Sequence, residues 1–264
     1  MSLPNISIRY ILEPRRGKGY AYNTGIAAAR GTILLFTDDD VRVPVDWIRR
    51  MSQPLLGGVA DAVAGGVVFP PEIAAVLARP PFSLRRPWFA STEDLDRHST
   101  DRMVGANMAF HRRVLDRVPK IDVELGPGGL GFGEETLFSR QLVEAGFKLR
   151  GTFDVEVEHC FDHTRLTGVS LLDLARKMGR CHAFVFHHWE HKRSRLAIPR
   201  LILSHLRLAW TRGMYRFRGN QANSISDQTV RAEHNLAFYR EYLVQRRRPR
   251  KYPLHGLAPC ETVA

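Results

Sequence analysis

The pattern of hydrophobic and polar positions predicts an α/β protein. Short apolar runs bounded by glycine or acidic residues predict strands over residues 32–36, 61–69, 102–111 and 155–160, and alternation around Arg9 predicts another over 6–12. Apolar residues at helical spacing predict helices over residues 20–30, 45–55, 134–145, 170–188, 199–218 and 230–244. Strands therefore alternate with helices up to about residue 165, and only helices follow.

Three consecutive acidic residues, Asp38, Asp39 and Asp40, follow the apolar run of residues 32–36. Neighbouring carboxylates repel one another unless a cation or hydrogen-bond donors offset the repulsion. Hard oxygen ligands suit Mg²⁺ or Mn²⁺, which bind through one or two carboxylates plus substrate phosphates, and ligands bind at the carboxyl edge of an α/β sheet. The spacing alone leaves two interpretations open: a metal site, or an acidic turn that caps the next helix through Asp40 or Asp46.

Two glycine-containing segments precede predicted helices. The Gly-Lys-Gly turn around Lys18 could place backbone N–H groups and a cation against a diphosphate, with a solvated basic turn as the alternative because the spacing does not match a Walker loop. Residues 126–133 (GPGGLGFG) lead into Glu134 and Glu135. Two acids at a helix start are stabilised by the helix dipole, but the flexible loop before them also allows one of them to act as a general base.

Three further stretches of the sequence carry weaker signals. Residues 70–98 are rich in proline and arginine and have no period, which predicts a mobile, irregular excursion over the active face. His159 lies on a predicted strand, where a single histidine is more often a hydrogen-bonded filler than a metal ligand. The histidines of residues 182–191 gather at the end of a predicted helix, and a surface-facing helix end accounts for them.

Charge changes the interpretation of the C-terminal third. The 264 residues carry a net charge of +12, with 44% hydrophobic and 25% charged residues, as in ordinary globular proteins. Residues 1–165 contain equal numbers of basic and acidic residues, so the whole surplus lies in residues 166–264. Such asymmetry predicts a polyanionic partner: a membrane surface, a lipid phosphate or a nucleic acid. Residues 199–218, apolar on one face and rich in arginine on the other, have the profile of an interfacial helix or of one packed on a domain.

Cysteine usage and hydropathy bear on location. The three cysteines, Cys160, Cys181 and Cys260, are too few and too widely spaced for a disulfide framework or a zinc site, which favours a reducing compartment. No secretory signal opens the sequence, and no stretch is long enough and uncharged enough to span a bilayer. The prediction is a cytoplasmic protein, with peripheral association at the inner face of the cell membrane as a further expectation.

Five segments, taken in order, resemble the family-2 glycosyltransferases of the GT-A fold over residues 6 to about 190. They are GKGYAYNTGIAAARGTILLFTDDD, VGANMAFHRRVL, GFGEETLFSRQLVEAG, VEHCFDHTRLT and ARKMGRCHA. The resemblance implies a Rossmann-like mixed sheet flanked by helices, with the GT-A catalytic core in residues 1–165 and a basic helical extension in residues 166–264.

The resemblance also implies an activity: transfer of a sugar from a UDP-, GDP- or dTDP-linked donor, with Mn²⁺ or Mg²⁺, to a hydroxyl of a glycan, a lipid-linked acceptor or a cell-envelope precursor. Asp38 and Asp40 match the acids of the family's DxD motif. Asp40 would bind the metal, Asp38 would contact the ribose or a metal-bound water, and Asp39 could share the metal role. His159 falls where many relatives carry a histidine that contacts metal or phosphate. Positions similar to family residues near the diphosphate are Lys18, Asn23 and Arg165.

The Glu134-Glu135 pair occupies the place of the family's Glu-Asp pair, whose Asp deprotonates the acceptor hydroxyl for attack with inversion. Here the Asp position holds Glu135, so the base remains open between Glu135 and Glu134. The family's N-terminal strand–helix–strand segment, which reads the nucleoside base, has no match before residue 6. We therefore expect an N-terminally incomplete core with an unpaired sheet edge.

Two alternatives remain. One is a retaining transferase of the same fold, and the other is an inactive, truncated remnant that binds a membrane or another polyanion. A nucleic-acid partner is not favoured, because no recognisable reading motif is present.

Overall fold

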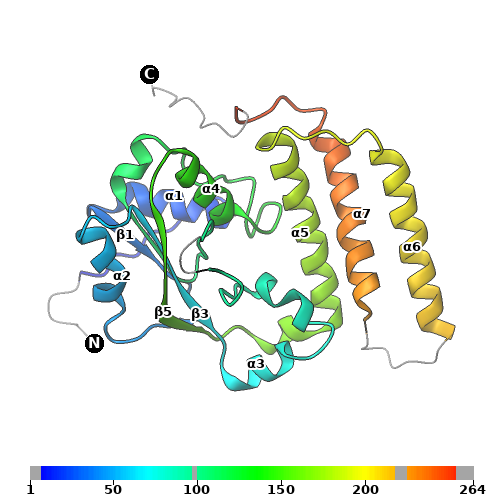
Figure 1. The fold of residues 1–264 in the computed structure, drawn as a ribbon, viewed down its shortest axis with the longest axis horizontal. Coiled ribbons are helices and arrows are strands. Elements are labelled where there is room, and N and C mark those ends of the chain that lie inside the picture. The colour runs from blue at the N-terminus through cyan, green and yellow to red at the C-terminus, as the bar shows by residue number, and fades with distance from the viewer. Residues whose placement is uncertain (1–6, 97–99, 218–224, 254–264) are drawn as a thin grey trace.

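A mixed five-stranded sheet organises the computed structural model, which describes residues 7–96, 100–217 and 225–253 (Figure 1). The strand order is β1-β4-β3-β5-β2. Strand β3 runs parallel to β5, and the other neighbouring pairs are antiparallel. The predicted fold class, a mixed α/β sheet flanked by helices with a helical C-terminal part, is confirmed. The strands are β1 (Ile33–Phe36), β2 (Val41–Arg42), β3 (Ala62–Val68), β4 (Met108–His111) and β5 (Leu149–His159).

Helices cover both faces of the sheet. Helices α1 (Lys18–Ala28) and α4 (Glu134–Glu144) pack on one face, and α2 (Trp47–Leu56) packs on the other. Strand β3 has the sequence AVAGGVV because it is buried between these layers, where only small or β-branched side chains fit. Its alanines at 62 and 64 join the α1–α4 core, and Val63 and Val67 join the α2 core.

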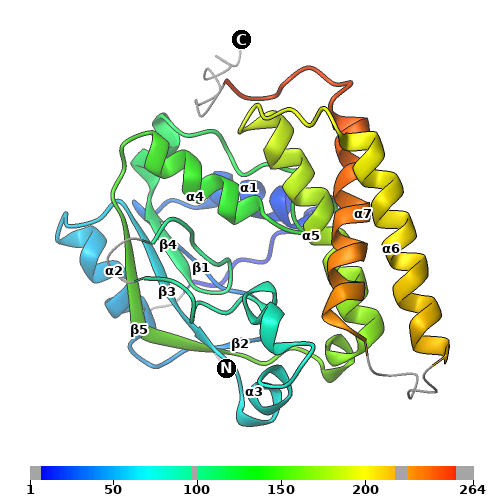
Figure 2. The same cartoon turned by 45° about the vertical axis from the view of Figure 1, so that its right-hand side comes forward.

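Three long helices form the C-terminal part: α5 (Gly168–His188), α6 (Ala197–Phe217) and α7 (Asp227–Gln245). Helix α7 lies between α5 and α6, so α6 is the outermost element in both ribbon views (Figures 1 and 2). No helix in the described part of the chain combines the length and the apolar content needed to cross a bilayer.

Residues 70–96 are partly helical and packed, so the expectation of an irregular segment is wrong for this described part. Its expected position over the active face agrees with the structure, because Trp88 and Ser91 line the same cavity as Asp38. This segment contains α3 (Pro71–Leu77) and the 3₁₀ helices η1 (Ser83–Phe89), and it fills the space between the sheet and α5. Its buried Ile73, Leu77 and Phe89 pack in one cluster with Phe161 and Leu171. The proline-interrupted spacing hides this burial, because the apolar partners lie far away in sequence. Residues 97 and 98 lie outside the described residues.

The prediction of a strand over residues 6–12 is also wrong where it can be seen. Residues 7–12 form no strand, and Ile8, Tyr10 and Leu12 are 80%, 85% and 71% exposed; residue 6 lies outside the described residues. Alternation alone cannot make a strand without a neighbour to complete its hydrogen bonds. The predicted strand over 102–111 is confined to β4, because residues 102–107 form a loop that enters the sheet edge. Strand β5 is longer than predicted, and Arg218 of the predicted helix 199–218 lies outside the described residues.

Asn107 connects the layers at that edge. Its fully buried side chain accepts a bond from Trp47 Nε1 (2.8 Å) and donates to the carbonyls of Gly66 and Val155 (2.8 Å each). A Cβ on Gly65 would lie 2.1 Å from the Asn107 amide nitrogen, so this strand position must be glycine for the amide to fit. One side chain thus ties α2, β3 and β5 together beside the acidic segment.

Candidate active site

The acidic segment crosses the carboxyl edge of the sheet. Strand β1 lies at one side of the sheet and β2 at the other, so residues 37–40 pass along the ends of the strands between them. Strands β1, β3 and β5 share one direction, and this edge is where α/β sheets bind ligands. Val41 pairs with His159 across β2 and β5, which brings His159 Nε2 to 3.4 Å from Asp40 Oδ1.

Protein cations offset the repulsion among these acids. Lys18 Nζ lies 2.7 Å from Asp38 Oδ1, and Arg165 lies 3.6 Å from Asp40 Oδ2. Burial works against the charged form of Lys18, but interactions with Tyr22, Glu135 and Asp38 outweigh it and raise the lysine pKa above its ordinary value. Burial lowers the pKa of His159, which keeps this imidazole neutral and able to donate a lone pair. Asp39 is exposed.

A cavity of about 790 Å³ adjoins the acidic segment. The predicted site residues that line it are Lys18, Asp38, Asp39, Asp40, Glu134, Glu135, His159 and Arg165. Asn23 is not among the lining residues. Its side-chain amide donates to the Ile121 carbonyl (2.8 Å) and accepts from the Ile121 N–H (3.1 Å), so it anchors α1 to the loop before residues 126–133.

The two glycine segments pack directly on each other. The Lys18 N–H donates to the Pro127 carbonyl (2.9 Å), and a Cβ on Gly128 would lie 2.7 Å from the Gly17 Cα. A Cβ on Gly19 would lie 2.9 Å from the Asp122 carbonyl oxygen. These glycines therefore serve contact between two backbones, and the Lys18 N–H that could have approached a diphosphate is already bonded within the protein.

The two glutamates at the start of α4 have different surroundings. The Glu134 carboxyl is 2% exposed and lies against Gly126, where a Cβ would be 2.7 Å from its carboxyl carbon. Burial and the neighbouring charge of Glu135 raise the pKa of Glu134 well above its ordinary value. Glu135 interacts instead with Lys18 and Tyr22. The Oε2 atoms of both glutamates are buried without a hydrogen-bond partner among the described residues, although both side chains line the cavity.

Comparison with known proteins finds a similarity in the first part of the chain. The model of Glycosyl transferase family 2 matches residues 4–118, which is less than half of the 264 residues. No curated protein matches the chain.

Solved glycosyltransferase structures resemble this one at low identity. Glucosyl-3-phosphoglycerate synthase from Mycobacterium tuberculosis, in complex with phosphoglyceric acid, is 22% identical, with 68% of this chain and 58% of that chain covered and a TM-score of 0.38. A mannosyltransferase from Pyrobaculum calidifontis, in complex with GDP-Man and Mn²⁺, is 14% identical, with 88% and 67% covered and a TM-score of 0.45. The chain thus spans 58% of the length of the synthase.

The family-2 match covers only part of the site. Lys18 and the three aspartates lie within the matched residues, whereas Glu134, Glu135, His159 and Arg165 lie beyond them. The residues inside the match and those beyond it line the same cavity, so the cavity is what brings them together. Other parts of its wall come from η1, α5 and α7, including Trp88, His182, Phe186 and Phe238, with Arg140 from α4. No local sequence pattern marks these residues, because elements far apart in the chain contribute them.

The donor set suits a divalent cation only in part. No group of three or more His, Cys, Asp or Glu side chains in the described residues is arranged to hold a metal ion. Asp38 and Asp40 offer hard carboxylate oxygens at one edge of the cavity, and Mg²⁺ or Mn²⁺ commonly uses one or two carboxylates with substrate phosphates and water as the other ligands. The residues present therefore fit a cation that a diphosphate helps to bind.

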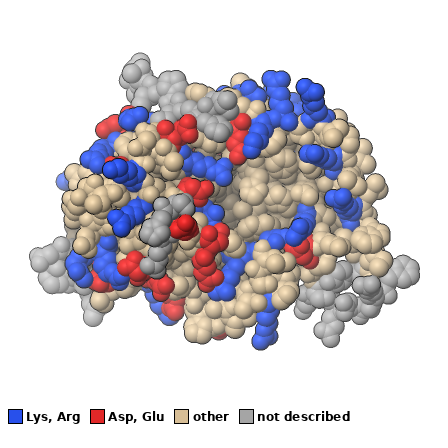
Figure 3. Space-filling model, viewed as in Figure 1, with Lys and Arg blue, Asp and Glu red and all other residues tan. Residues whose placement is uncertain are grey.

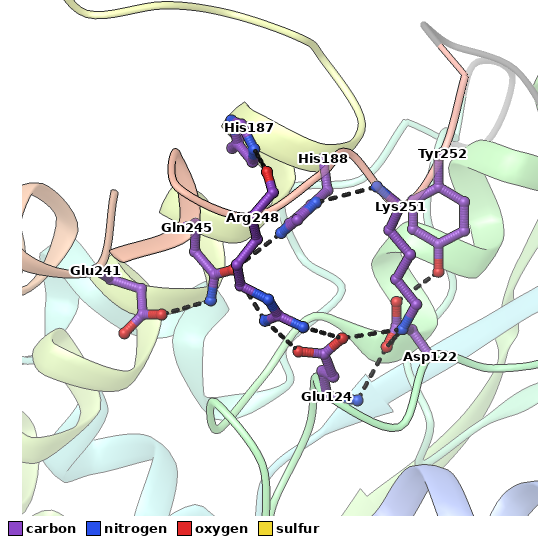
Figure 4. Close-up of polar contacts among 9 residues, drawn as sticks. All are labelled: Asp122, Glu124, His187, His188, Glu241, Gln245, Arg248, Lys251 and Tyr252. Carbon is purple, nitrogen blue, oxygen red and sulfur yellow. Dashed lines mark hydrogen bonds and ion pairs between the residues drawn. The ribbon is translucent and has the colours of Figure 1, made fainter. Parts of the chain in front are cut away.

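A C-terminal clasp, defined as residues 246–253 with the loop residues Asp122 and Glu124, holds the loop that leads into residues 126–133 (Figure 4). The Asp122 carboxylate accepts from the Tyr252 hydroxyl and from Lys251 Nζ (2.9 Å). Arg248 donates to both Glu124 oxygens (2.6 and 3.1 Å). The Glu124 carbonyl in turn accepts from the N–H of Leu130 (2.9 Å), which carries the connection into residues 126–133.

Two histidines join α5 to this clasp (Figure 4). His188 Nδ1 accepts from the Lys251 N–H (3.2 Å), so its Nε2 donates to Gln245 (2.9 Å). His187 Nε2 lies 3.1 Å from the Arg248 carbonyl. Both side chains are buried, and burial lowers both pKa values. The interpretation of this cluster as a surface-facing helix end is therefore wrong for His187 and His188.

We predict that Tyr252→Phe lowers the free energy of unfolding by about 1.5–3 kcal/mol, because the variant removes a hydrogen bond to a buried carboxylate. Urea denaturation measures the change. The control is Tyr239→Phe, whose hydroxyl has a 3.5 Å contact with Arg200; we expect it to stay within about 0.5 kcal/mol of the parent. Equal, small effects of both variants would contradict the role given to the clasp.

We predict that Glu134→Gln stabilises the protein at neutral pH. The pKa of Glu134 is raised in the folded state, so above the unfolded-state pKa of about 4.3 the unfolded chain releases a proton that the folded protein keeps, and stability falls as pH rises. The variant lacks this loss. Its advantage should grow from about pH 4.5 upward, by at most about 1.4 kcal/mol per pH unit. Denaturation across pH tests this, with Glu144→Gln, at the exposed end of the same helix, as the control. A constant difference between variant and parent would refute it.

Proposed function

We propose that the protein is a metal-dependent glycosyltransferase that moves a sugar from a nucleotide-sugar donor to a hydroxyl of an acceptor. The observation that carries this proposal is the cavity that joins the aspartates and Lys18 of the family-2 region to the glutamate pair of α4. Cations and carboxylates in the cavity suit a diphosphate and its metal, and the Glu135 carboxylate that lines the same cavity suits proton transfer. In this proposal residues 1–165 form the catalytic core and residues 166–264 a basic helical region.

At the donor end, Lys18 and Arg165 supply positive charge for the diphosphate of a UDP-, GDP- or dTDP-linked sugar. Asp40 would hold Mn²⁺ or Mg²⁺, with Asp39 and His159 as further candidate ligands at the same edge of the cavity. Asp38 would contact the ribose or a metal-bound water. When bound, the cation neutralises charge that develops on the departing nucleoside diphosphate.

At the acceptor end, Glu135 is the better candidate for the general base. The pKa of Glu134 is raised by burial, which favours its protonated form, and a protonated carboxyl cannot accept the acceptor's proton. Glu135 lies close enough to Lys18 and Tyr22 to interact with both, and it lines the cavity. Its carboxylate would take the hydroxyl proton as the acceptor oxygen attacks the anomeric carbon from the side opposite the diphosphate, with inversion. Glu134 would hold Gly126 and the loop in place.

The wall of the cavity that η1, α5 and α7 form suits an acceptor with an apolar surface or a sugar ring. Trp88, Val185, Phe186 and Phe238 line it, and flat aromatic surfaces suit sugar rings and lipid-linked aglycones. A glycan or a lipid-linked acceptor therefore agrees with this wall. The proposed location is the cytoplasm or the inner face of the cell membrane, with the anionic membrane as a partner.

Two other functions remain as alternatives. A retaining transferase of the same fold would use the glutamates to position the acceptor rather than to deprotonate it. An inactive module that binds a membrane or another polyanion would account for the basic C-terminal region, but it needs neither the aspartates nor the buried glutamate pair. Duplex DNA is the less favoured polyanion, because no reading motif is present.

We predict that one donor among UDP-, GDP- and dTDP-sugars stabilises the protein in the presence of Mn²⁺, by about 2.7 kcal/mol at a hundredfold excess over the dissociation constant. Asp40→Ala should abolish this stabilisation, because it removes a carboxylate at the cation edge of the cavity. Thermal unfolding measures the effect. Asp46→Ala, at the start of α2 and outside the cavity, is the matched control and should keep it. A donor response that survives Asp40→Ala would contradict the assignment.

We predict that the product has inverted anomeric configuration and that Glu135→Gln lowers kcat by about 10²–10⁴-fold, the usual contribution of a general base. Glu134→Gln should keep kcat within about tenfold, because the raised pKa of that carboxyl already favours its neutral form. Steady-state kinetics measures kcat of each variant, and NMR of the anomeric proton gives the configuration of the product. A larger loss of kcat in Glu134→Gln than in Glu135→Gln would make Glu134 the general base. A product with retained anomeric configuration would favour the retaining transferase.

A further inference from the structure

The outer face of α6 is apolar, the reverse of an ordinary surface helix. The helix packs on α7 through its other face, where Ala197 and Leu208 are buried. The residues that face away are each 44–62% exposed: Ile198, Ile202, Leu203, Leu206 and Trp210. Because four of these follow one another at intervals of four residues, they form one stripe along the helix. Contiguous exposed apolar residues of this kind mark an interaction surface.

Basic side chains border the stripe on both sides. At 3.6 residues per turn, Arg200 and Arg207 lie along one border, and His205 and Arg212 lie along the other. Residues 191–226 contain eight Lys or Arg and no Asp or Glu. On the face drawn in Figure 3, acidic side chains gather over the sheet part of the molecule, whereas the helical part shows mainly basic ones. The stripe is therefore an apolar surface in a positive field.

We propose that α6 docks on an anionic lipid bilayer, with the stripe in the acyl–headgroup boundary and the bordering arginines on lipid phosphates. Long arginine side chains at the edge of an apolar face reach headgroups while their stems cover apolar surface, and a tryptophan near the end of the stripe is suited to the interface. A second copy of the same face is the less favourable occupant, because two such surfaces would bring like charges together.

The position of α6 agrees with this docking. Helix α7 separates α6 from α5, and it is α5 and α7 that line the cavity, so a bilayer against α6 would not cover the site (Figures 1 and 2). The inference deepens the proposed function by naming the surface that meets its membrane partner. It is tested separately from the transferase activity, since lipid binding can be measured without donor or acceptor.

Co-sedimentation with vesicles tests the proposal. The full chain should bind vesicles of phosphatidylcholine mixed with phosphatidylglycerol, bind phosphatidylcholine alone far more weakly, and lose affinity as salt rises. The double variant Ile202→Glu/Leu206→Glu should bind the anionic vesicles at least about tenfold more weakly, because burial of two large apolar side chains is lost. Ile48→Glu is the matched control: it is 62% exposed on α2, away from α6, and should bind like the parent.

Tryptophan fluorescence gives a second readout. Emission should shift to shorter wavelength on anionic vesicles, and Trp210→Phe should remove most of that shift. Absence of binding to anionic vesicles would overturn the proposal, as would equal binding by the double variant. Analytical ultracentrifugation tests whether a second copy of the protein binds the stripe instead. A dimer that dissociates in the double variant would show that it does, and would overturn the proposal of membrane docking. The substituted positions are exposed, so circular dichroism should show an unchanged fold.

Discussion

The backbone contact between Gly17 and Gly128 is the constraint on which the candidate site depends. It brings together two segments more than a hundred residues apart, and it leaves no room for a Cβ on the Gly128 side. Lys18 follows directly: its N–H bonds to the loop, and its side chain reaches Asp38. Because the same loop ends at Glu134 and Glu135, this one contact sets the spacing between the carboxylates at the sheet edge and those of α4. A larger residue at position 128 would separate them.

The two glutamates show how one dipeptide can supply two different groups. Both lie at the start of α4, where the helix dipole favours negative charge, yet Glu134 is buried against Gly126 and Glu135 lies near a lysine. Burial without a compensating bond costs stability, and the raised pKa of Glu134 expresses that cost. Buried groups with a shifted pKa are typical of functional sites. In the proposed function Glu134 positions the loop beside Glu135, and the C-terminal clasp holds the preceding part of the same loop through Asp122 and Glu124.

The sequence predicted the features that depend on local order. An apolar run that ends in three acids predicts a buried strand with a carboxylate cluster at its end. The structure has the strand and the cluster, but β1 lies at the edge of the sheet and only Leu34 in it is buried. Errors arose where distant segments decide the outcome. Ile73, Leu77 and Phe89 are buried in a cluster with residues of α5, which no local pattern reveals. Asn23 bonds to Ile121 across 98 residues. His187 and His188 are polar by type but buried by residues near the C-terminus. The cavity wall from α5 and α7 was missed for the same reason.

The bundle of three C-terminal helices faces the cavity on one side and solvent on the other. One buried carboxylate, that of Glu233, joins the three helices to one another. Glu233 of α7 is 3% exposed and receives Arg176 from α5 (3.0 Å) and Arg212 from α6 (2.5 Å). A buried carboxylate tolerates this position only because both guanidinium groups are present, so the pairing fixes how the three helices sit against one another. The inward surface of α5 and α7 then completes the cavity, and the outward surface of α6 carries the apolar stripe. Since Arg212 also borders that stripe, the bond that assembles the helices also orients the surface proposed to meet the bilayer.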